Sequence, residues 1–216
     1  MAEMRYREAL NLALREEMHA DERVFLMGED VGVFQGGFKV TAGLLEEFGE
    51  RRVRDTPISE NTIVGMGVGA AMAGLRPIVE LMTINFSLLA PDQIVNSAAS
   101  IRYMFGAQVK VPLVIRMPQG AGHQLGPTHS HSFEALYQHV PGLLVAVPTT
   151  AADAHGLLNA AIRHHTPVIF IEHETLYGRR GEVPDDQEPL RFGGAAVRRE
   201  GGDVSIVRIS RMAETA

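Results

Sequence analysis

The chain has 216 residues, 45% of them hydrophobic, with a formal net charge of −6 and no cysteine. That length suits one large domain, or one domain and part of a second. The lack of cysteine excludes disulfides and thiolate metal sites, and an acidic chain without a basic stripe is not expected to bind nucleic acid. No long apolar run and no signal peptide stand out, so we expect a cytoplasmic protein with no membrane segment.

Strands and helices are expected to alternate along most of the chain. Tyr6, Leu10, Leu14 and Met18 repeat every four residues and predict a first amphipathic helix. Further helices are expected at residues 44–49, 61–73, 91–104, 132–138 and 151–164, and strands at residues 24–27, 53–55, 78–82, 111–117, 143–147 and 168–172. This alternation predicts an α/β fold, with a Rossmann-like parallel sheet covered by helices on both faces.

The composition changes after residue 177. Residues 178–191 are charged and contain glycine and proline, which is typical of a linker. Residues 195–197 and 204–209 are strand-like apolar runs, but a strand pair this short cannot bury a core of its own. We therefore expect a domain at 1–177, a linker at 178–191, and at 192–216 either strands docked on that domain or the first strands of a second α/β domain.

Glu60 is the first candidate site residue, because it lies where an expected strand ends and a helix begins. Ligands bind at the carboxyl ends of the strands of an open α/β sheet, and a helix N-terminus favours a negative charge. An acidic residue at a helix start is also a common stabilising feature, worth only ~0.3–1 kcal/mol. The assignment of Glu60 therefore depends on its surroundings.

Small residues fill the helix that follows Glu60. Gly65 and Gly69 lie four residues apart and predict a smooth helix face that packs closely against a neighbour. Gly65, Gly67 and Ala70 also match the dinucleotide fingerprint G-x-G-x-x-A. That fingerprint needs a buried strand immediately before it, and residues 60–62 are too polar for one. Close packing is the favoured interpretation, and nucleotide binding is the alternative.

Met82 and Phe86 follow the third expected strand. Residues at such positions are usually part of the core. Phe86, however, lies between the polar residues Asn85 and Ser87. A flat ring at the edge of a sheet could stack on a heteroaromatic ligand.

A glycine-rich loop at residues 119–131 follows the fourth expected strand and carries His123, His129 and His131. Histidine transfers protons near neutral pH, so this loop is a candidate for acid–base chemistry. The histidine spacing matches no strong zinc motif. A solvated polar loop is the alternative, above all for His123.

Six motifs, in this order, resemble the beta subunits of the thiamine-diphosphate-dependent 2-oxo acid dehydrogenases. They lie at residues 55–60, 69–77, 80–87, 92–96, 129–132 and 139–143, and so run through nearly the whole chain. They are most similar to the pyruvate-specific members, with acetoin and branched-chain members as alternatives.

The resemblance implies the partners and the cofactor. Such subunits form α2β2 heterotetramers, so an alpha subunit and a second beta subunit are expected. Thiamine diphosphate would lie between the subunits, with its diphosphate and Mg²⁺ held by the alpha subunit and its pyrimidine ring held by this chain. The product acyl group would pass to a lipoyl-bearing acyltransferase core.

The resemblance also assigns roles to residues. Glu60 would hydrogen-bond a ring nitrogen of the aminopyrimidine and so promote formation of the ylid. Phe86 would stack on the pyrimidine, Met82 and Ile58 would line the pocket, and Glu29 is a weaker pocket candidate.

His129 would face the thiazolium side, where it would stabilise intermediates or assist acyl transfer to the lipoyl arm. Pro127 and Thr128 stand where many relatives have Ala-Gln, which is a departure from the family pattern. The segment at 161–167 lacks the acidic and amide residues found in relatives that bind structural potassium, so no metal is expected. Relatives continue through a second domain, and a chain without it could be a non-catalytic remnant that only binds an alpha subunit.

Overall fold

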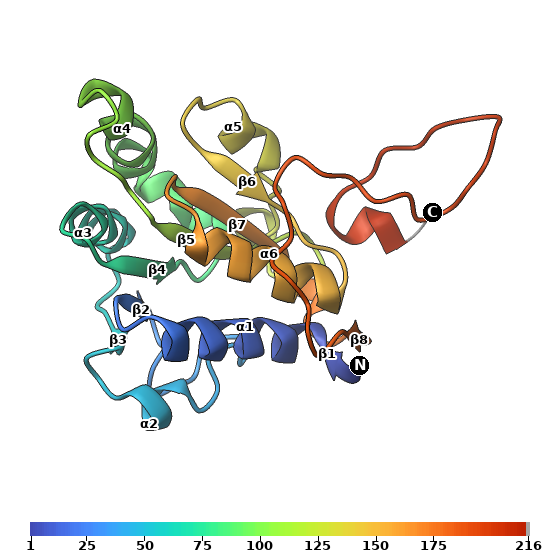
Figure 1. The fold of residues 1–216 in the computed structure, drawn as a ribbon, viewed down its shortest axis with the longest axis horizontal. Helices are drawn as coiled ribbons and strands as arrows, with labels where there is room; N and C mark the ends of the chain where they lie inside the picture. Colours follow the sequence, from blue (N-terminus) through green and yellow to red (C-terminus); the bar gives the residue numbers. More distant parts are fainter. Residues whose placement is uncertain (215–216) are drawn as a thin grey trace.

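The computed structural model describes residues 1–214. Six parallel strands form a central sheet in the order β3-β2-β4-β5-β7-β6 (Figure 1). These strands are β2 (Val24–Gly28), β3 (Val53–Asp55), β4 (Arg76–Glu80), β5 (Val114–Gln119), β6 (Leu144–Ala146) and β7 (Val168–His173). The sheet confirms the α/β fold predicted from the alternating pattern.

Helices cover both faces of the sheet (Figure 1). One apolar cluster joins the sheet to α1 (Tyr6–Ala20) and α6 (Ala151–Arg163). The opposite cluster joins it to α3 (Glu60–Met72), the π-helix η2 (Asp92–Ala99) and α5 (Glu134–Gln138). The other helical segments are α2 (Leu44–Phe48), α4 (Ile101–Met104), η1 (Ile84–Leu89), η3 (Pro127–His129), η4 (Glu174–Leu176) and η5 (Ser210–Glu214).

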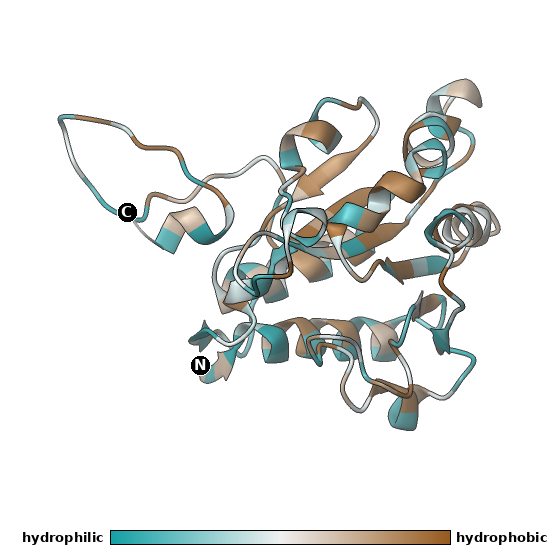
Figure 2. Cartoon of the chain, turned by 180° about the vertical axis from the view of Figure 1, so that it is seen from behind, coloured by the Kyte–Doolittle hydropathy of each residue, from teal (hydrophilic) through white to brown (hydrophobic). Residues whose placement is uncertain are grey.

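The central strands are buried along their whole length, as expected for a parallel sheet between two helical layers. Every residue of β5 and of β7 is buried. Figure 2 shows the hydrophobic colour concentrated on the sheet and on the inner faces of the helices. The stripe predicted for α1 is also confirmed, since Tyr6, Leu10, Leu14 and Met18 are all buried.

Two expected elements differ in detail from the prediction. The helix predicted at 91–104 is divided into η2 and α4. Near the division, the Ser100 hydroxyl donates to the Val95 carbonyl oxygen at 2.9 Å and so takes up a backbone acceptor. The strand predicted at 111–117 begins only at Val114, after Pro112, which has no N–H for a ladder.

An antiparallel strand pair was not predicted. It joins β1 (Ala2–Arg5) to β8 (Arg180–Val183), with Ala2 opposite Val183. Val183 packs against α1 and α6 through Ala9 and Ala151. The segment predicted as a linker at 178–191 therefore contains a strand.

The tail from residue 192 leaves the sheet as an extended loop (Figure 1). The strands predicted at 195–197 and 204–209 do not form. Ile206 is 63% exposed and Val207 is 93% exposed, because no sheet edge or apolar surface within residues 1–214 covers them. Arg198, which pairs with Asp153 at 2.8 Å, ties the tail to α6. Residues 215–216, the last of the predicted second segment, lie outside the described residues.

Candidate functional site

Four predicted site residues lie at the carboxyl edge of four neighbouring strands. Glu29 follows β2, and Glu60 begins α3 after β3. Phe86 lies in η1 after β4, and His129 ends η3 after β5. Because β3, β2, β4 and β5 are adjacent in the sheet, residues that are distant in sequence meet at one edge. In open α/β sheets, this edge is where ligands bind.

Glu60 is buried, with 3% of its surface exposed. In the part of the chain that the structure describes, no group donates a hydrogen bond to its carboxylate. The preceding Ser59 does not cap α3, since its hydroxyl donates to the Thr62 hydroxyl at 2.7 Å. Neither carboxylate oxygen is fully enclosed by the described residues, so Glu60 presents an open acceptor to a group that the chain itself does not supply.

Glu29 is a second buried acid at this edge, with 6% exposure. Among residues 1–214, its Oε1 atom is buried without a hydrogen-bond partner. Burial raises the pKa of Glu29, and the negative charges of Glu60 and Asp30 raise it further. The electrostatic effect of Glu60 on Glu29 indicates that the two carboxyl groups share one region.

The loop that carries Glu29 is fixed to the end of β3 by Asp55. The Asp55 carboxylate accepts hydrogen bonds from the backbone N–H groups of Gly32, at 2.6 Å, and Val33, at 3.0 Å. The N–H of Thr56 donates to the Gly28 carbonyl oxygen at 2.9 Å. These bonds hold the segments leading to Glu29 and Glu60 in one arrangement.

Phe86 and His129 contact each other across the same edge. Their rings meet edge to face, with centroids 5.3 Å apart. Phe86 is half-buried, whereas Met82 is 39% exposed and Ile58 is 81% exposed. The two apolar side chains predicted to line a pocket are therefore open to solvent in this chain.

A buried ionic network beneath the edge was not predicted. Arg116, with 1% exposure, pairs with Glu80 and with Glu172, whose Oε2 lies 2.7 Å from an Arg116 nitrogen. The Tyr177 hydroxyl donates to Glu172 at 2.6 Å. Burial raises the pKa of Glu80, while Arg116 opposes that shift. Charged residues within otherwise apolar strands were the signal for this network.

The glycines of α3 do not form a nucleotide-binding turn, because the whole G-x-G-x-x-A match lies inside the helix. A Cβ atom at Gly67 would lie 2.8 Å from Val79 and 3.0 Å from Leu113, so close packing is confirmed there. Gly69, which was predicted to share the packed face, has nothing within 4 Å in the described chain.

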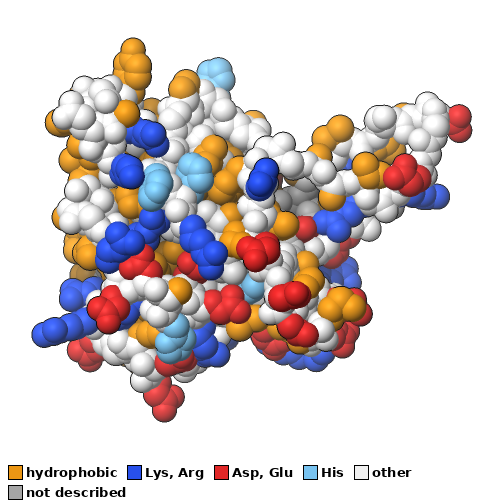
Figure 3. Space-filling model, viewed as in Figure 1, with side chains coloured by type: hydrophobic (Ala, Val, Ile, Leu, Met, Phe, Trp, Pro, Cys, Tyr) orange, Lys and Arg blue, Asp and Glu red, His pale blue; other side chains and the backbone are white. Residues whose placement is uncertain are grey.

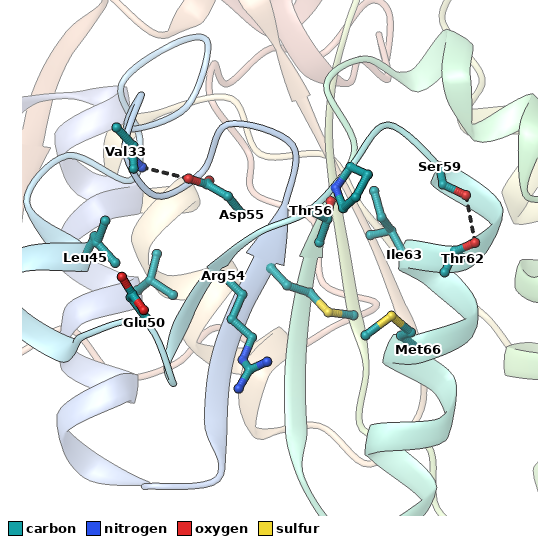
Figure 4. A pocket seen from close by; sticks show the side chains of 13 residues that line it. Val33, Leu45, Glu50, Arg54, Asp55, Thr56, Ser59, Thr62, Ile63 and Met66 are labelled. Atoms are coloured by element: carbon teal, nitrogen blue, oxygen red, sulfur yellow. Dashed lines mark hydrogen bonds between the residues drawn. The ribbon is translucent and has the colours of Figure 1, made fainter.

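A cavity of 470 Å³ lies between α2, β3 and α3 (Figure 4). Its lining includes Met27, Val53 and Ile63, and also Thr56, whose hydroxyl is buried without a partner among residues 1–214. None of the predicted site residues lines it. The candidate site is therefore the region at the strand ends, where the buried acids and the aromatic pair lie.

The surface and the remaining side chains add few features. Acidic and basic side chains are interspersed on the face shown in Figure 3. Within residues 1–214, no group of three or more histidine, aspartate or glutamate side chains is arranged to hold a metal ion. No helix in this range is long and apolar enough to cross a membrane.

Comparison with known proteins places this geometry in a wider context. The family "Transketolase, pyrimidine binding domain" matches residues 2–180. The chain is 56% identical over 208 residues to the pyruvate dehydrogenase E1 component subunit beta of Rhizobium meliloti, covering 96% of this chain and 45% of that protein. It is 54% identical over 204 residues to the same subunit of Rickettsia felis, covering 94% of this chain and 63% of that protein.

A solved structure supports the fold alone. A split-gene transketolase, described as an inactive beta4 tetramer, is similar with a TM-score of 0.78 at 21% identity. The match covers 97% of this chain and 64% of that one. The chain thus spans about half to two thirds of the length of the proteins that it matches.

Proposed function

Because this chain belongs to the family of transketolase-type pyrimidine-binding domains, we propose that it forms the pyrimidine-binding half of a thiamine diphosphate site. With an alpha subunit, it would take part in the oxidative decarboxylation of pyruvate and in acetyl transfer to lipoamide. The two relatives named as pyruvate dehydrogenase beta subunits, at 56% and 54% identity, support pyruvate as the substrate.

The observation that carries the proposal is Glu60, a largely buried residue whose carboxylate receives no hydrogen bond within residues 1–214. An aminopyrimidine offers hydrogen-bond donors and acceptors on a flat ring. Glu60 supplies the carboxylate that such a ring can meet, and the unpartnered Oε1 of Glu29 lies in the same region. The residues present therefore fit the pyrimidine end of the cofactor.

Each residue at the edge has a role in this proposal. When bound, thiamine diphosphate supplies the carbon nucleophile that attacks a 2-oxo acid and accepts the electrons released on decarboxylation. Glu60 holds a proton shared with a pyrimidine nitrogen, and Phe86 offers its face for stacking. Met82 and Ile58 would exclude water from the cofactor once the alpha subunit covers them. His129, which contacts Phe86, donates or accepts a proton on the side where substrate reacts.

The need for a partner subunit is inferred from the exposed side chains at the site and from the diphosphate end of the cofactor, for which the described residues offer no metal cluster. Ile58 and Met82 are exposed, and residues 1–214 contain no metal cluster that would hold a diphosphate. An alpha subunit that carries Mg²⁺ and the diphosphate would complete the site in an α2β2 assembly with a second beta subunit. A lipoyl-bearing acyltransferase core would receive the acetyl group.

The test is turnover by the chain purified together with its alpha subunit, thiamine diphosphate and Mg²⁺. Pyruvate, acetoin and a branched-chain 2-oxo acid would be compared by release of product and by acylation of a lipoyl domain. Glu60→Gln is expected to lower the cofactor-dependent rate by roughly 10²- to 10⁴-fold, the range for loss of general acid–base catalysis. Asp92→Asn removes the same charge at another helix start and should leave the rate unchanged.

Three results would decide between the alternatives. Preference for acetoin or a branched-chain acid would change the substrate but keep the site. A stable complex with cofactor bound and no turnover by the unmutated chain would favour the non-catalytic remnant. Full activity of Glu60→Gln would contradict the proposed site.

A further inference from the structure

The loop that carries His129 is closed by bonds at its two ends. The N–H of Gly120 donates to the carbonyl oxygen of His131 at 3.0 Å. The side chain of Gln119 accepts from the N–H of Phe133 at 3.2 Å and also donates to Glu134. His129 therefore lies close to the closed end of the loop, two residues before His131.

His131 has a second connection, through its imidazole ring. Its Nδ1 atom is hydrogen-bonded to the side-chain amide nitrogen of Asn85, and its ring stacks on Phe133 with centroids 4.9 Å apart. Asn85 has 8% of its surface exposed, so its amide group is largely removed from water. The bond thus joins the loop after β5 to η1, which follows β4.

The orientation of the Asn85 amide fixes the tautomer of His131. The amide oxygen of Asn85 accepts a hydrogen bond from the Thr83 hydroxyl at 3.1 Å, so the amide nitrogen faces His131. An amide nitrogen can only donate. With the amide nitrogen in this orientation, Nδ1 of His131 is the acceptor, which corresponds to the Nε2–H tautomer.

This bond lies beside the proposed catalytic contact. Asn85 immediately precedes Phe86, and Phe86 contacts His129 edge to face at 5.3 Å. Among the described residues, the His129 ring has only the Thr128 hydroxyl, at 3.0 Å, as a hydrogen-bond partner, and the backbone N–H of His129 donates to the Gly126 carbonyl oxygen at 3.3 Å. The position of His129 against Phe86 thus depends on what holds the loop to η1.

We propose that His131, held by the hydrogen bond between its Nδ1 and Asn85, is the positioning residue that places His129 beside Phe86. The inference rests on the proposed function for its catalytic consequence, but the contact itself exists without cofactor. His131 acts through His129 and need not touch substrate.

The first experiment is NMR of histidines in the isolated chain, which needs no activity. The ¹⁵N shifts of His131 are expected to show an unprotonated Nδ1 near neutral pH, and Asn85→Leu should convert this to a mixture of tautomers. The Hε1 shift of His129 should move in Asn85→Leu and in His131→Phe, which keeps the ring stacked on Phe133. His123→Phe, on the same loop but without a bond to Asn85, should leave His129 unchanged.

The second experiment is kinetics of the complex with its alpha subunit. His131→Phe is expected to lower kcat roughly three- to tenfold, the worth of one hydrogen bond, with little change in KM. Asn85→Leu combined with His131→Phe should lose little more than either change alone, because both remove one interaction. In His131→Asn, the amide oxygen is separated from Cα by as many bonds as Nδ1 is in histidine, so it can still accept from Asn85. This variant should therefore keep most of the rate that His131→Phe loses.

The outcomes separate this inference from the proposed function. An unmoved His129 signal in His131→Phe would overturn the positioning role, whether or not the complex turns over. If the NMR shifts behave as expected but the complex shows no thiamine-dependent activity, the positioning of His129 by the bond between Asn85 and His131 is supported, and only the catalytic role of His129 is contradicted. Equal loss of activity in His131→Phe and His123→Phe would also overturn the role.

Discussion

His173 shows how a single side chain supports the histidine loop. Its Nδ1 atom accepts the Thr175 N–H at 3.3 Å, and a Cβ atom at Gly120 would lie 2.3 Å from its Nε2. Burial lowers the pKa of His173 from 6.5, and the positive charge of Arg211 lowers it further, against an opposite effect of Glu134. The neutral ring is therefore the form that fits beneath the loop.

This lowered pKa makes stability depend on pH. As pH falls below the unfolded value of 6.5, the unfolded chain binds a proton that the folded chain does not, so the free energy of unfolding decreases. The decrease should continue until the lower folded pKa is reached. In His173→Asn, whose amide oxygen can still accept the Thr175 N–H, the loss between about pH 7 and about pH 5 should be smaller. Urea unfolding at several pH values in this range measures the free energy of unfolding of the unmutated chain and of His173→Asn. The same pH dependence in both proteins would contradict the prediction.

Arg116 gives a second prediction at this scale. Removing the guanidinium in Arg116→Met leaves two buried carboxylates, Glu80 and Glu172, without their counter-ion. We expect a loss of about 3–5 kcal/mol in the free energy of unfolding, because an unpaired buried charge is strongly destabilising. Chemical denaturation measures this loss.

The control for Arg116→Met is the same change combined with Glu80→Gln and Glu172→Gln. Without the buried charges, much of the lost stability should return. If the triple variant is no more stable than Arg116→Met alone, packing and not charge explains the effect.

At the scale of elements, α3 offers a matched pair of glycines. Gly69→Ala should raise the free energy of unfolding by ~0.5–1 kcal/mol, because alanine is a better helix former and nothing lies within 4 Å of its Cβ. Gly67→Ala should lower it by ~1–3 kcal/mol, because its Cβ would lie 2.8 Å from Val79. Thermal unfolding of both variants of the isolated chain is the measurement, and shifts of the same sign would contradict the packing described here.

The elements that carry strong local patterns could be predicted from the sequence. Five of the six strands of the parallel sheet and the stripe of α1 follow from apolar runs and a four-residue repeat, whereas β3 is only Val53-Arg54-Asp55. The pair of β1 and β8 could not be found in this way, because four-residue polar strands 175 or more residues apart have no local signal. The prediction of strands in the tail was wrong for the opposite reason. Val204 and Ile206 have strand propensity, but within residues 1–214 no sheet edge lies beside them to pair with.

The candidate site also has features that could be predicted from the sequence and features that could not. Glu60 at a helix start could be recognised from its position, and the structure adds that it is buried and unpartnered. The link between Asn85 and His131 joins loops that follow different strands, so only the order of strands in the sheet brings the two residues together. The roles of all six site residues stay predictions: Glu60, His129, Phe86, Ile58, Met82 and Glu29.

At the scale of the whole molecule, the tail and the N-terminal strand should contribute unequally to stability. Removing residues 193–216, which keeps the core-packed Phe192, should change the melting temperature by no more than about 2 °C, since Val197, Val204 and Val207 are exposed and, of this tail, only η5 contacts β7 among the described residues. Removing residues 1–5 should lower it by several degrees, because β8 then loses its partner. Calorimetry of the two truncated chains tests this, and a larger effect from the tail would show that it packs in solution.

The closure of β1 on β8 has a consequence for synthesis on the ribosome. The first strand finds its partner, and α1 finds α6, only after most of the domain has been translated. Contacts this distant in sequence form late and slow the folding of the chain. Until then, the apolar stripe of α1 stays exposed to chaperones. An affinity tag attached at Met1 would lie next to the pair of β1 and β8, which forms late.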